Sequence, residues 1–525
     1  MKDLILSVDC GTQSLRTFLF DSKGKMWAFS KIDYDPYSSP YPGWAEQDPE
    51  IYWSAFLKSL ENLKEQIDNF QSRVAGITVT TLSDTMINVD KDGNPLRPAI
   101  LWLDQRKNFL NLRKRPFLTR LSHILVNMDE PFIILQSESK VDWIRNYQPD
   151  IWKSTDKFLQ VSGFFNFRLT GKPVDSIASQ IGHIPFDYKK KSWASKDNVS
   201  YMLFYVEPEK LPDLVEPSTV IGKITSKASA QTGLIEGTPV LSCGSDKGCE
   251  TIGTGCVENY KANVSLGTMA SIQMTSKKYF EPIKFMPAYP SVIPGAYNPS
   301  VSIFRGFWMV TWFKNEFGFK ERLDAEKLGI FEENLLDEMI SKVPAGSLGL
   351  ISQPYWGPGL KMPEAKGAFI GFGESHTRAH MYRAMIEGIG YALLEGLIKI
   401  EKRGKVKVKS LTVSGGGSKS NDICQIFSDI FGLPVEKSEI NEAAGLGAAI
   451  VASVGIGMNE NFDIAAREMV RYSQKFLPNS ANHELYQKLF KVYERMYPRL
   501  KKLYGDIRKI TNYPEIKAND MPAQI

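Results

Sequence analysis

The segment from Asp9 to Arg16 reads Asp-Cys-Gly-Thr-Gln-Ser-Leu-Arg and separates two apolar runs. A glycine and two hydroxyls in a tight turn can present N–H and O–H groups to phosphate oxygens. The carboxylate of Asp9 can hold Mg²⁺, which keeps much of its hydration shell. We therefore expect Asp9 to serve a metal ion, and the following residues to contact phosphate: Gly11, Thr12, Gln13, Ser14 and Arg16.

A second turn of the same kind contains Gly267 and Thr268, between the apolar runs 262–266 and 270–272. Two Gly-Thr turns that face each other would hold a polyphosphate from both sides. In phosphoryl transfer the protein does little covalent chemistry, but it must position the reactants and stabilise charge. The pair of turns therefore favours a polyphosphate ligand and chemistry at its phosphates.

Three consecutive glycines follow a predicted strand and precede a predicted helix over residues 422–431. Glycines let a backbone approach a flat ligand closely, and the N-terminus of the helix adds a favourable dipole. The spacing is neither GxxxxGK[ST] nor GxGxxG, so it indicates neither a P-loop nor a dinucleotide fold. We expect a nucleotide site here that contains Gly415, Gly416, Gly417, Ser418 and Asn421.

Asp246 follows an apolar run at 237–242 and lies close in sequence to Gly244 and Lys247. A carboxylate at the end of a strand can accept the proton of an attacking hydroxyl, and it can share a metal ion with Asp9. An aspartate after a strand is, by itself, more often the N-cap of a helix. This motif alone leaves both interpretations open.

His376 and His380 are four residues apart, which is a metal-ligand spacing on a helix. No glutamate follows His376 and no third ligand is nearby in the sequence, so we favour polar residues that lead into a helix. The cysteines are five in number and widely spaced, which is typical of reduced, buried thiols.

The elements that must position these residues begin with three predicted strands, 4–8, 15–20 and 25–32, joined by turns. A helix is expected over 50–70 and a β-branched strand over 74–80. The second Gly-Thr turn repeats the opening pattern, which indicates a duplicated α/β unit. We therefore predict two domains, 1–247 and 248–525, joined by a hinge of a few residues near 247–256. A further helix, kinked at Pro498, is expected over 484–504.

Composition sets broader limits. The chain has 525 residues, 43% of them hydrophobic and 23% charged, which is ordinary for a globular protein and long enough for two domains. The net charge of +5 is too small to indicate a nucleic-acid partner, and a dense basic cluster over 106–120 is interpreted as a solvated face. No apolar run approaches the ~20 residues of a membrane helix. We expect a cytoplasmic protein, and a homodimer is compatible with the sequence.

Taken in order, the motifs resemble the FGGY carbohydrate kinases along nearly the whole chain. The resemblance rests on their order and spacing together, since each motif alone is common. The segments that carry it are Asp9-x-Gly11-Thr12-x-Ser14-x-Arg16, Gly43-Trp44-x-Glu46-Gln47, Trp102-x-Asp104-x-Arg106, Lys140-x-x-Trp143, Gly244-x-Asp246, Ser265-Leu266-Gly267-Thr268, Gly415-Gly416-Gly417-Ser418-x-Ser420-Asn421 and Glu442-Ala443-Ala444-Gly445.

The resemblance implies an α/β fold of two ribonuclease-H-like domains, as in actin, heat-shock chaperones and hexokinase, with a cleft between them. It implies ATP-dependent phosphorylation of a hydroxyl on a small sugar, ketose or polyol, with ATP and Mg²⁺ as cofactors. Asp246 matches the family's catalytic base and Asp9 its Mg²⁺ position. Thr12 and Thr268 match phosphate-contacting hydroxyls, and the adenosine cradle corresponds to Gly416, Gly417 and Asn421.

The substrate is less clear from the family pattern. Ser83 and Asp84 occupy the place where xylulose kinases carry Met-His and glycerol kinases carry Arg-Glu, and Asp84 could accept hydrogen bonds from vicinal hydroxyls. Three alternatives stay open: a kinase of a non-sugar hydroxylated metabolite, a non-catalytic sugar or nucleotide sensor, and an actin- or chaperone-like ATPase. The expected substrate-binding residues are Ser83, Asp84, Trp102, Asp104, Asp246 and Lys247.

Overall fold

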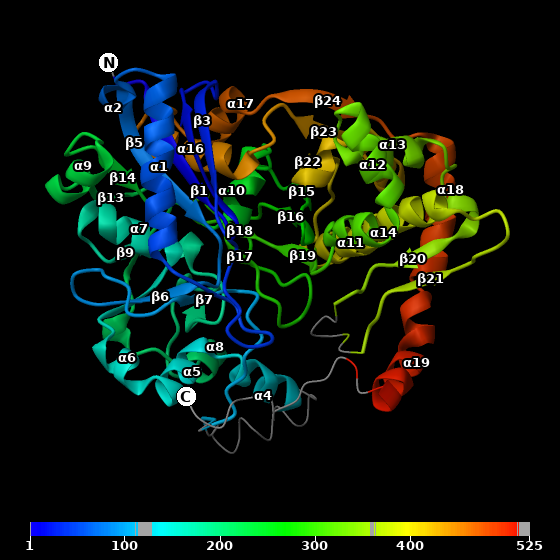
Figure 1. The fold of residues 1–525 in the computed structure, drawn as a ribbon, viewed down its shortest axis with the longest axis horizontal. Helices are drawn as coiled ribbons and strands as arrows, with labels where there is room; N and C mark the ends of the chain where they lie inside the picture. The colour runs from blue at the N-terminus through cyan, green and yellow to red at the C-terminus, as the bar shows by residue number, and fades with distance from the viewer. Residues whose placement is uncertain are drawn as a thin grey trace.

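The computed structural model describes residues 2–110, 112–113, 129–357, 362, 364–511 and 513. Two six-stranded sheets form its frame and stand side by side in Figure 1. The first has the order β13-β14-β5-β1-β2-β3. Its strands are β1 (Leu4–Cys10), β2 (Ser14–Phe20), β3 (Met26–Asp33), β5 (Val74–Thr81), β13 (Val220–Lys223) and β14 (Pro239–Leu241).

The second sheet has the order β19-β16-β15-β22-β23-β24. In both sheets three strands form an antiparallel meander, two parallel strands follow, and an antiparallel strand closes the far edge. The duplicated α/β unit predicted from the repeated Gly-Thr turn is therefore present. Its second copy contains β15 (Lys261–Leu266), β16 (Ala270–Met274), β19 (Ser300–Ile303), β22 (Ser410–Ser414), β23 (Val435–Ser438) and β24 (Tyr472–Phe476).

The continuous apolar run of β1 is explained by burial on both faces of the first sheet. Successive side chains of a strand point to opposite faces. Leu4, Leu6 and Val8 share a core with the residues of α1 (Glu50–Gln66) and α7 (Val161–Thr170). Ile5 instead belongs to a core with α16 (Ala443–Gly455). A helix from the second half of the chain thus covers one face of the first sheet.

Helix α16 also packs against α10 (Asp246–Gly253), and the two lie between the sheets in Figure 1. Glycines allow this close approach. A Cβ on Gly253 would lie 1.9 Å from the carbonyl oxygen of Ala443, and one on Gly447 would lie 1.9 Å from that of Cys249. Backbone-to-backbone packing of this kind fixes α10, and with it Asp246 at its first turn, relative to both sheets.

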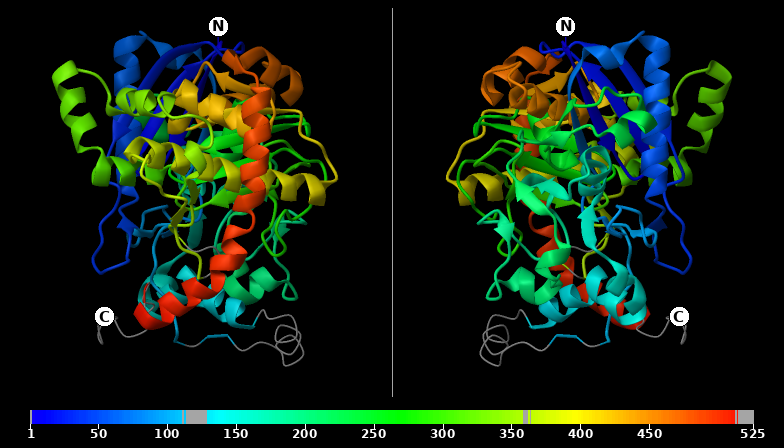
Figure 2. Two further views of the ribbon diagram at one scale, coloured as in Figure 1. Left: turned by 90° about the vertical axis from the view of Figure 1, so that its right-hand side faces the viewer. Right: turned by 90° about the vertical axis from the view of Figure 1, so that its left-hand side faces the viewer.

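Helices also surround the second sheet. The longest, α14 (Arg378–Gly404), packs on β16 and β19, and α15 (Asn421–Phe431) packs on α14 and β23. Figure 2 shows α18 (Ser480–Tyr493) and α19 (Met496–Thr511) running along the height of the molecule. The remaining helices of this half are α11 (Trp308–Phe317), α12 (Phe319–Leu328), α13 (Glu332–Ser341) and α17 (Phe462–Met469), and its short strands are β17 (Tyr289–Pro290), β18 (Tyr297–Asn298), β20 (Ile351–Gln353) and β21 (Ala368–Ile370).

A smaller layer lies below the first sheet in Figure 1, built on the four-stranded sheet β4-β7-β6-β8. This layer carries the segments that the sequence analysis assigned to the substrate. Its elements are β4 (Glu46–Gln47), β6 (Met86–Val89), β7 (Ala99–Ile100), β8 (Lys157–Gln160), α4 (Asp129–Ser137), α5 (Lys140–Tyr147), α6 (Pro149–Ser154) and α8 (Val199–Phe204), and the first half also contains α2 (Phe70–Arg73), α9 (Ser226–Thr232), β9 (Val174–Ser176), β10 (Phe186–Asp187), β11 (Ser192–Trp193) and β12 (Asp213–Val215).

Three details differ from the predicted elements. The helix expected over 50–70 ends at Gln66, and Asn69, with φ +53°, separates it from α2. The tail helix is interrupted at 494–495 rather than kinked at Pro498, which lies in the first turn of α19, where proline is tolerated. The division predicted between residues 247 and 248 falls inside α10, so the chain leaves the first half through a packed helix. Within the described residues, no helix is both long and apolar enough to cross a membrane.

Candidate active site

The first Gly-Thr turn joins β1 to β2 and is closed by the Gly11 N–H, which donates to the Ser14 carbonyl at 2.9 Å. Two side chains from the small layer hold the turn from outside. Gln47 Nε2 donates to the Thr12 carbonyl at 3.2 Å, and the indole Nε1 of Trp102 donates to Thr12 Oγ1 at 3.1 Å. The turn is therefore positioned by the segments that surround the expected substrate site.

Asp9 lies at the end of β1, and its side chain is 9% exposed. Arg16 Nη1 contacts its Oδ2 at 3.2 Å, and Arg16 Nε lies 3.3 Å from Glu442 Oε2, just before α16. Burial raises the pKa of Asp9, and the Asp246 and Glu442 charges add to this; the Arg16 charge opposes it, leaving the pKa at about 6. The first turn is thus tied to the second half of the chain through one arginine.

Asp246 begins α10, whose N-cap is Ser245, and its Oδ1 accepts the backbone N–H of Lys247 at 2.7 Å. Burial raises the pKa of its carboxyl, with the Lys247 charge opposing and the Glu250 charge adding to the rise. The cap interpretation thus applies to the neighbouring serine, and the Asp246 carboxylate is left close enough to Asp9 to raise the pKa of that group. Two carboxylates at one point, Asp9 buried and Asp246 half-buried, can serve a proton and a cation.

Lys247 points toward the second sheet. Its Nζ donates to Glu250 Oε2 at 2.7 Å and to Ser265 Oγ, at the end of β15, at 2.8 Å. Glu250 Oε1 in turn accepts Ser265 Oγ at 2.8 Å and Ser414 Oγ, at the end of β22, at 2.7 Å. This network links α10 to both strands that lead into the predicted nucleotide loops. The ammonium group of Lys247, which was predicted to bind substrate, is thereby held at the end of β15.

The second Gly-Thr turn and the three glycines are adjacent, because β15 and β22 are parallel neighbours. Gly415 has φ +80°, and a Cβ there would lie 2.8 Å from the carbonyl carbon of Leu266. A Cβ on Gly416 would meet nothing within 4 Å, whereas one on Gly417 would lie 2.3 Å from the Phe307 ring. Gly416 is therefore the glycine with free space above it for a ligand, and Gly415 and Gly417 serve the close packing of the loop.

Two polar residues of the loop have local partners. Ser418 Oγ donates to the Gly415 carbonyl at 2.7 Å, which places this hydroxyl inside the loop. Asn421 is the first residue of α15, and its Oδ1 accepts Lys437 Nζ at 3.0 Å. Gly267 and Thr268 bind α11 through their carbonyls, which accept the N–H groups of Phe307 and Trp308 at 3.1 and 3.3 Å. Thr268 itself is exposed, so its hydroxyl is available to a ligand.

These observations place the two Gly-Thr turns, Asp9, Asp246 and the glycine loop around the N-terminus of α10. Sequence profiles of the FGGY family of carbohydrate kinases match both halves, the N-terminal domain over residues 4–253 and the C-terminal domain over 262–456. The chain belongs to the FGGY family of carbohydrate kinases. It is a phosphotransferase that takes its phosphoryl group from ATP and has an alcohol group as acceptor.

Individual relatives span the whole chain. The xylulose kinase of Staphylococcus epidermidis is 27% identical over 519 residues, covering 98% of this chain and 100% of that protein. The uncharacterized sugar kinase YgcE of Escherichia coli is 28% identical over 491 residues, covering 93% and 92%. The crystal structure of xylulose kinase from Rhodospirillum rubrum has a TM-score of 0.80 at 25% identity, covering 96% and 100%. The predicted two-domain α/β kinase fold is confirmed.

On the substrate side of this FGGY kinase, Asp84 lies in the turn between β5 and β6, with φ +54°. The isolated bridge between Thr81 and Ser245 brings this turn beside Asp246. The neighbouring Ser83 is half-buried, and Lys140 Nζ lies 3.1 Å from Asp84 Oδ2. Asp84 therefore reaches the site, but its carboxylate is already paired.

Asp104, which was predicted to bind substrate, lies in the interior beside Arg106. Its side chain is 1% exposed, and both of its oxygens accept Arg106, from Nε at 2.8 Å and from Nη2 at 2.7 Å. The Arg106 guanidinium lies 3.9 Å from the ring centre of Trp44 and also pairs with Glu46. This buried ion-pair cluster holds the loop of Trp102 in place. Arg106 is therefore part of the interior rather than of a solvated face, and the basic residues Lys114, Arg115 and Arg120 lie outside the described residues.

Several residues of the site were missed from the sequence. His183 binds Asp84, and Glu250 connects α10 to the second sheet, but each lies in a segment where no spacing pattern marks it. Glu442, in the Glu-Ala-Ala-Gly motif, was recognised but given no role. Sequence patterns detect turns and strands, while these contacts join segments that are distant along the chain, so only the fold reveals them.

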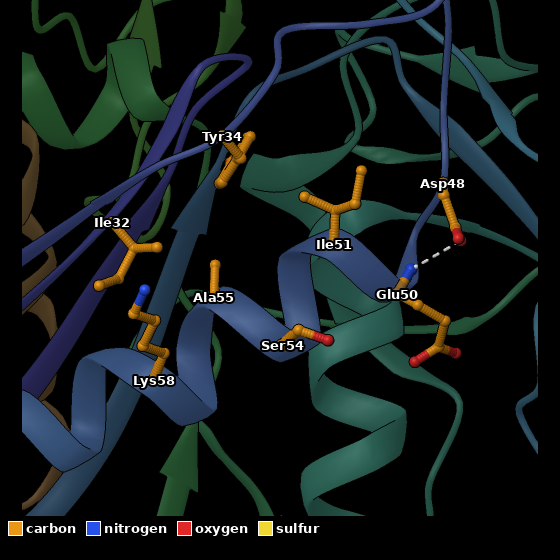
Figure 3. Close-up of a pocket in the computed structure, with 8 residues that line it drawn as sticks. All are labelled: Ile32, Tyr34, Asp48, Glu50, Ile51, Ser54, Ala55 and Lys58. Carbon is orange, nitrogen blue, oxygen red and sulfur yellow. Dashed lines mark hydrogen bonds between the residues drawn. The ribbon is translucent and has the colours of Figure 1, made fainter.

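One hollow of the described surface lies away from these residues. It has a volume of about 350 Å³, lies between β3 and α1 and is shown in Figure 3. None of the predicted site residues lines it. Tyr34, on its wall, donates to the Gly11 carbonyl at 2.5 Å, so this hollow borders the back of the first turn. Its lining residues are Ile32, Tyr34, Asp48, Glu50, Ile51, Ser54, Ala55 and Lys58.

The histidine pair and the cysteines have structural surroundings. His380 Nδ1 accepts the Thr377 N–H at 3.2 Å and completes a capping box at the start of α14, while His376 Nδ1 accepts the Gly373 N–H at 2.8 Å. Polar residues leading into a helix are thus what the structure shows. Nowhere in the described residues do three or more potential metal ligands form a cluster. The cysteines are buried and free: Cys10, Cys243, Cys249, Cys256 and Cys424.

Proposed function

We propose that this kinase transfers the γ-phosphoryl group of ATP to a hydroxyl of a small open-chain sugar or polyol, with Asp246 as the general base. The observation that carries the proposal is the place of Asp246. It lies half-buried at the start of α10, between the turn that ends β1 and the turn that ends β15. A base at this point can meet the substrate hydroxyl on one side and the phosphates on the other.

The substrate oxygen forms a bond to the γ-phosphorus while the bond from that phosphorus to the bridging oxygen of ADP breaks, and the hydroxyl proton passes to Asp246. Because burial raises the pKa of Asp246, the carboxylate is a better proton acceptor than an exposed aspartate. The Ser245 cap and the Lys247 N–H fix its orientation, so little reorganisation accompanies the transfer.

A Mg²⁺ ion fits the chemistry of Asp9 and Asp246. Burial raises the pKa values of both carboxyls; the charges of Asp246 and Glu442 add to the rise at Asp9 and that of Glu250 to the rise at Asp246, and a bound cation would oppose these effects. When bound, Mg²⁺ would neutralise charge on the phosphates. Asp9 and Asp246 are the residues that would hold it, while Arg16 keeps Asp9 oriented from the outside.

The nucleotide would be held between the two Gly-Thr turns, through Thr12 and Thr268, with its adenosine over Gly416. A Cβ on Gly416 would have no atom within 4 Å, and this free space supports placing the adenosine there. Lys247 would stand on the phosphate side rather than on the sugar side. Its bonds to Glu250 and Ser265 keep its positive charge close to the end of β15.

The proposal is tested by an ATP-consumption screen against ketoses, polyols, aldonic acids and short hydroxylated carbonyl compounds, with the phosphorylated product identified by mass spectrometry. We expect one structural group of open-chain polyhydroxy compounds to be phosphorylated well above the rest. ATP and sugar binding without any phosphorylated product would overturn the proposal in favour of a sensor. Turnover confined to compounds without a polyol chain would leave the kinase but replace its substrate class.

A further inference from the structure

The substrate-side turn contains a side-chain cluster that the family pattern does not explain. Asp84 Oδ1 accepts the backbone N–H of His183 at 2.8 Å, and its Oδ2 accepts the ring Nδ1–H of the same residue at 2.7 Å. Lys140 contacts Asp84 Oδ2 at 3.1 Å and also donates to the Asp84 carbonyl. Asp84 thus accepts two hydrogen bonds from His183 and is also paired with Lys140 of α5.

The backbone is shaped for this contact on both sides. Asp84 itself has φ +54°, which is uncommon for a residue other than glycine. Gly182 has φ +130°, and a Cβ there would lie 2.3 Å from Asp84 Oδ1. Any side chain at 182 would therefore separate the two segments. Backbone strain of this kind persists where the surrounding structure enforces it, often at a ligand site.

The same segment connects the cluster to Asp246. The Asp84 N–H donates to the Ile181 carbonyl at 3.0 Å, and the Ser245 N–H donates to the Ala178 carbonyl, also at 3.0 Å. Residues 178–183 therefore run from the residue before Asp246 to the Asp84 turn. A small molecule with one hydroxyl at Asp246 would have its neighbouring atoms near His183.

Two aromatic residues border the cluster on another side. Tyr188 Oη donates to the Gly182 carbonyl at 3.3 Å, and the Tyr289 ring lies edge-on to Tyr188, with 5.2 Å between ring centres. Burial raises the pKa values of both tyrosines, and the charge of Asp84 adds to the rise, so both lie near it. Aromatic side chains beside a few polar groups are the usual lining of small-molecule sites.

The charge state of the histidine follows from its neighbours. Burial disfavours the imidazolium, but the charge of Asp84, the hydrogen bond to it and the contact with Glu138 outweigh this effect and raise the pKa of His183 to about 9. The pKa of Asp84 is lowered despite its burial, because His183 and Lys140 stabilise its charge. At neutral pH the pair is therefore an imidazolium and a carboxylate.

The second donor of the imidazolium, Nε2–H, forms an ion pair with Glu138. The distance from Nε2 to Glu138 Oε2 is 3.6 Å, longer than a normal hydrogen bond, and Glu138 is also paired with Lys107, so a ligand oxygen would share this donor with Glu138. The His183 side chain is 26% exposed and that of Asp84 is 13% exposed. A carboxylate oxygen accepts more than one hydrogen bond. The cluster thus presents a fixed donor beside a fixed acceptor.

We propose that His183 and Asp84 form a donor–acceptor pair that binds two adjacent hydroxyls of the substrate and so determines which sugar is accepted. His183 Nε2–H donates to one hydroxyl oxygen, and Asp84 accepts the O–H of its neighbour. Lys140 and Gly182 position the pair. This inference rests on the proposed phosphorylation of a polyhydroxy compound and adds the residues that select it.

Two variants of His183 separate recognition from structure. In His183→Asn the amide can replace Nδ1 toward Asp84, but nothing replaces Nε2. In His183→Gln the amide can reach the Nε2 position. With the best substrate of the screen, we expect His183→Asn to raise the sugar KM by about 10- to 150-fold, the equivalent of one lost hydrogen bond to a charged group. The KM for ATP should stay within about 2-fold, and His183→Gln should recover part of the loss. His380→Asn, at the start of α14, is the matched control and should change neither KM.

The wild-type protein provides a second test that does not depend on the folding of a variant. Monodeoxy analogues of the substrate should lose kcat/KM by about 10-fold or more at two adjacent carbons and by less elsewhere. With the analogue that lacks the His183-bound hydroxyl, His183→Asn should cost nothing further. Equal use of all monodeoxy analogues, or an unchanged sugar KM in a folded His183→Asn enzyme, would overturn the pairing. A wild-type protein that phosphorylates no compound of the screen would instead overturn the proposed function on which the pairing rests.

Discussion

Asp9→Asn should make the ligand-free protein more stable while it impairs catalysis. Asp9 is buried, and its pKa is raised from 3.8 to about 6. Each pH unit between these values is equivalent to about 1.4 kcal/mol, so ionised Asp9 costs the folded state roughly 3 kcal/mol at pH 7.5. The asparagine variant does not carry this cost. For an unfolding unit of about 250 to 525 residues, this corresponds to a rise in Tm of roughly 3 to 6 °C.

The sign of the pH dependence follows from the same shift. Between pH 3.8 and about 6 the folded protein binds more protons at Asp9 than the unfolded chain does, so stability falls as pH rises through this window. The gain in free energy of unfolding of Asp9→Asn over the wild type should therefore fall from roughly 3 kcal/mol at pH 7.5 to about half of that at pH 5. Thermal unfolding of both proteins without nucleotide, at both pH values, measures it.

A matched control is available in Asp175, which is also buried and has a pKa raised to about 6. Its carboxylate accepts Ser162 Oγ at 2.8 Å and Gln180 Nε2 at 2.8 Å. Asp175→Asn loses structural hydrogen bonds and should lower the Tm. The activity defect of Asp9→Asn should be partly rescued by raised Mg²⁺, because we assign Asp9 to the ion. A Tm at or below that of the wild type at pH 7.5, or an equal gain at both pH values, would refute this account of Asp9.

Two further predictions concern glycines. Gly416→Val should raise the KM for ATP with little change in Tm, because the new Cβ has free space. Gly417→Val should lower the Tm, because its Cβ would meet the Phe307 ring. Equal Tm losses in the two variants would contradict this distinction. Gly447→Ala should destabilise the protein by at least about 1–3 kcal/mol and lower kcat, because its Cβ would lie 1.9 Å from the Cys249 carbonyl oxygen and displace α10. Thermal unfolding measures the stability and steady-state kinetics the kcat. An unchanged Tm would show that α10 and α16 can separate at no cost.

The strands and turns that surround the site could be predicted from the sequence because they are local. The apolar runs at 4–8 and 15–20 and the β-branched run at 74–80 became β1, β2 and β5 with small changes at their ends. The helix expected over 422–431 begins one residue earlier, at Asn421. Turn chemistry and alternation of burial depend on neighbouring residues, so they are readable without the fold.

The contacts that complete the site could not be predicted in this way. Helix α16 packs on the first sheet through residues that are more than 400 positions apart in the sequence. Asp104 was interpreted from its motif as a ligand of the substrate, but the motif does not reveal that Arg106 takes both of its oxygens in the interior. His183 is one of five histidines and has no spacing signal. Its role follows only from the strained turn of Asp84 and the glycine beside it.

The central claim is that Asp246 accepts the proton of the attacking hydroxyl, and steady-state kinetics of Asp246→Asn test it most directly. The variant keeps the shape and one acceptor oxygen but loses the charge. With the substrate found by the screen and Mg²⁺ varied, the account predicts a kcat lower by at least ~10²-fold. The KM for ATP should be near normal and the Tm no lower than that of the wild type. Raised Mg²⁺ should leave most of the kcat loss in place, because the ion cannot replace the lost proton acceptor even though Asp246 also helps to hold it. A folded Asp246→Asn enzyme with near-normal kcat would contradict the claim.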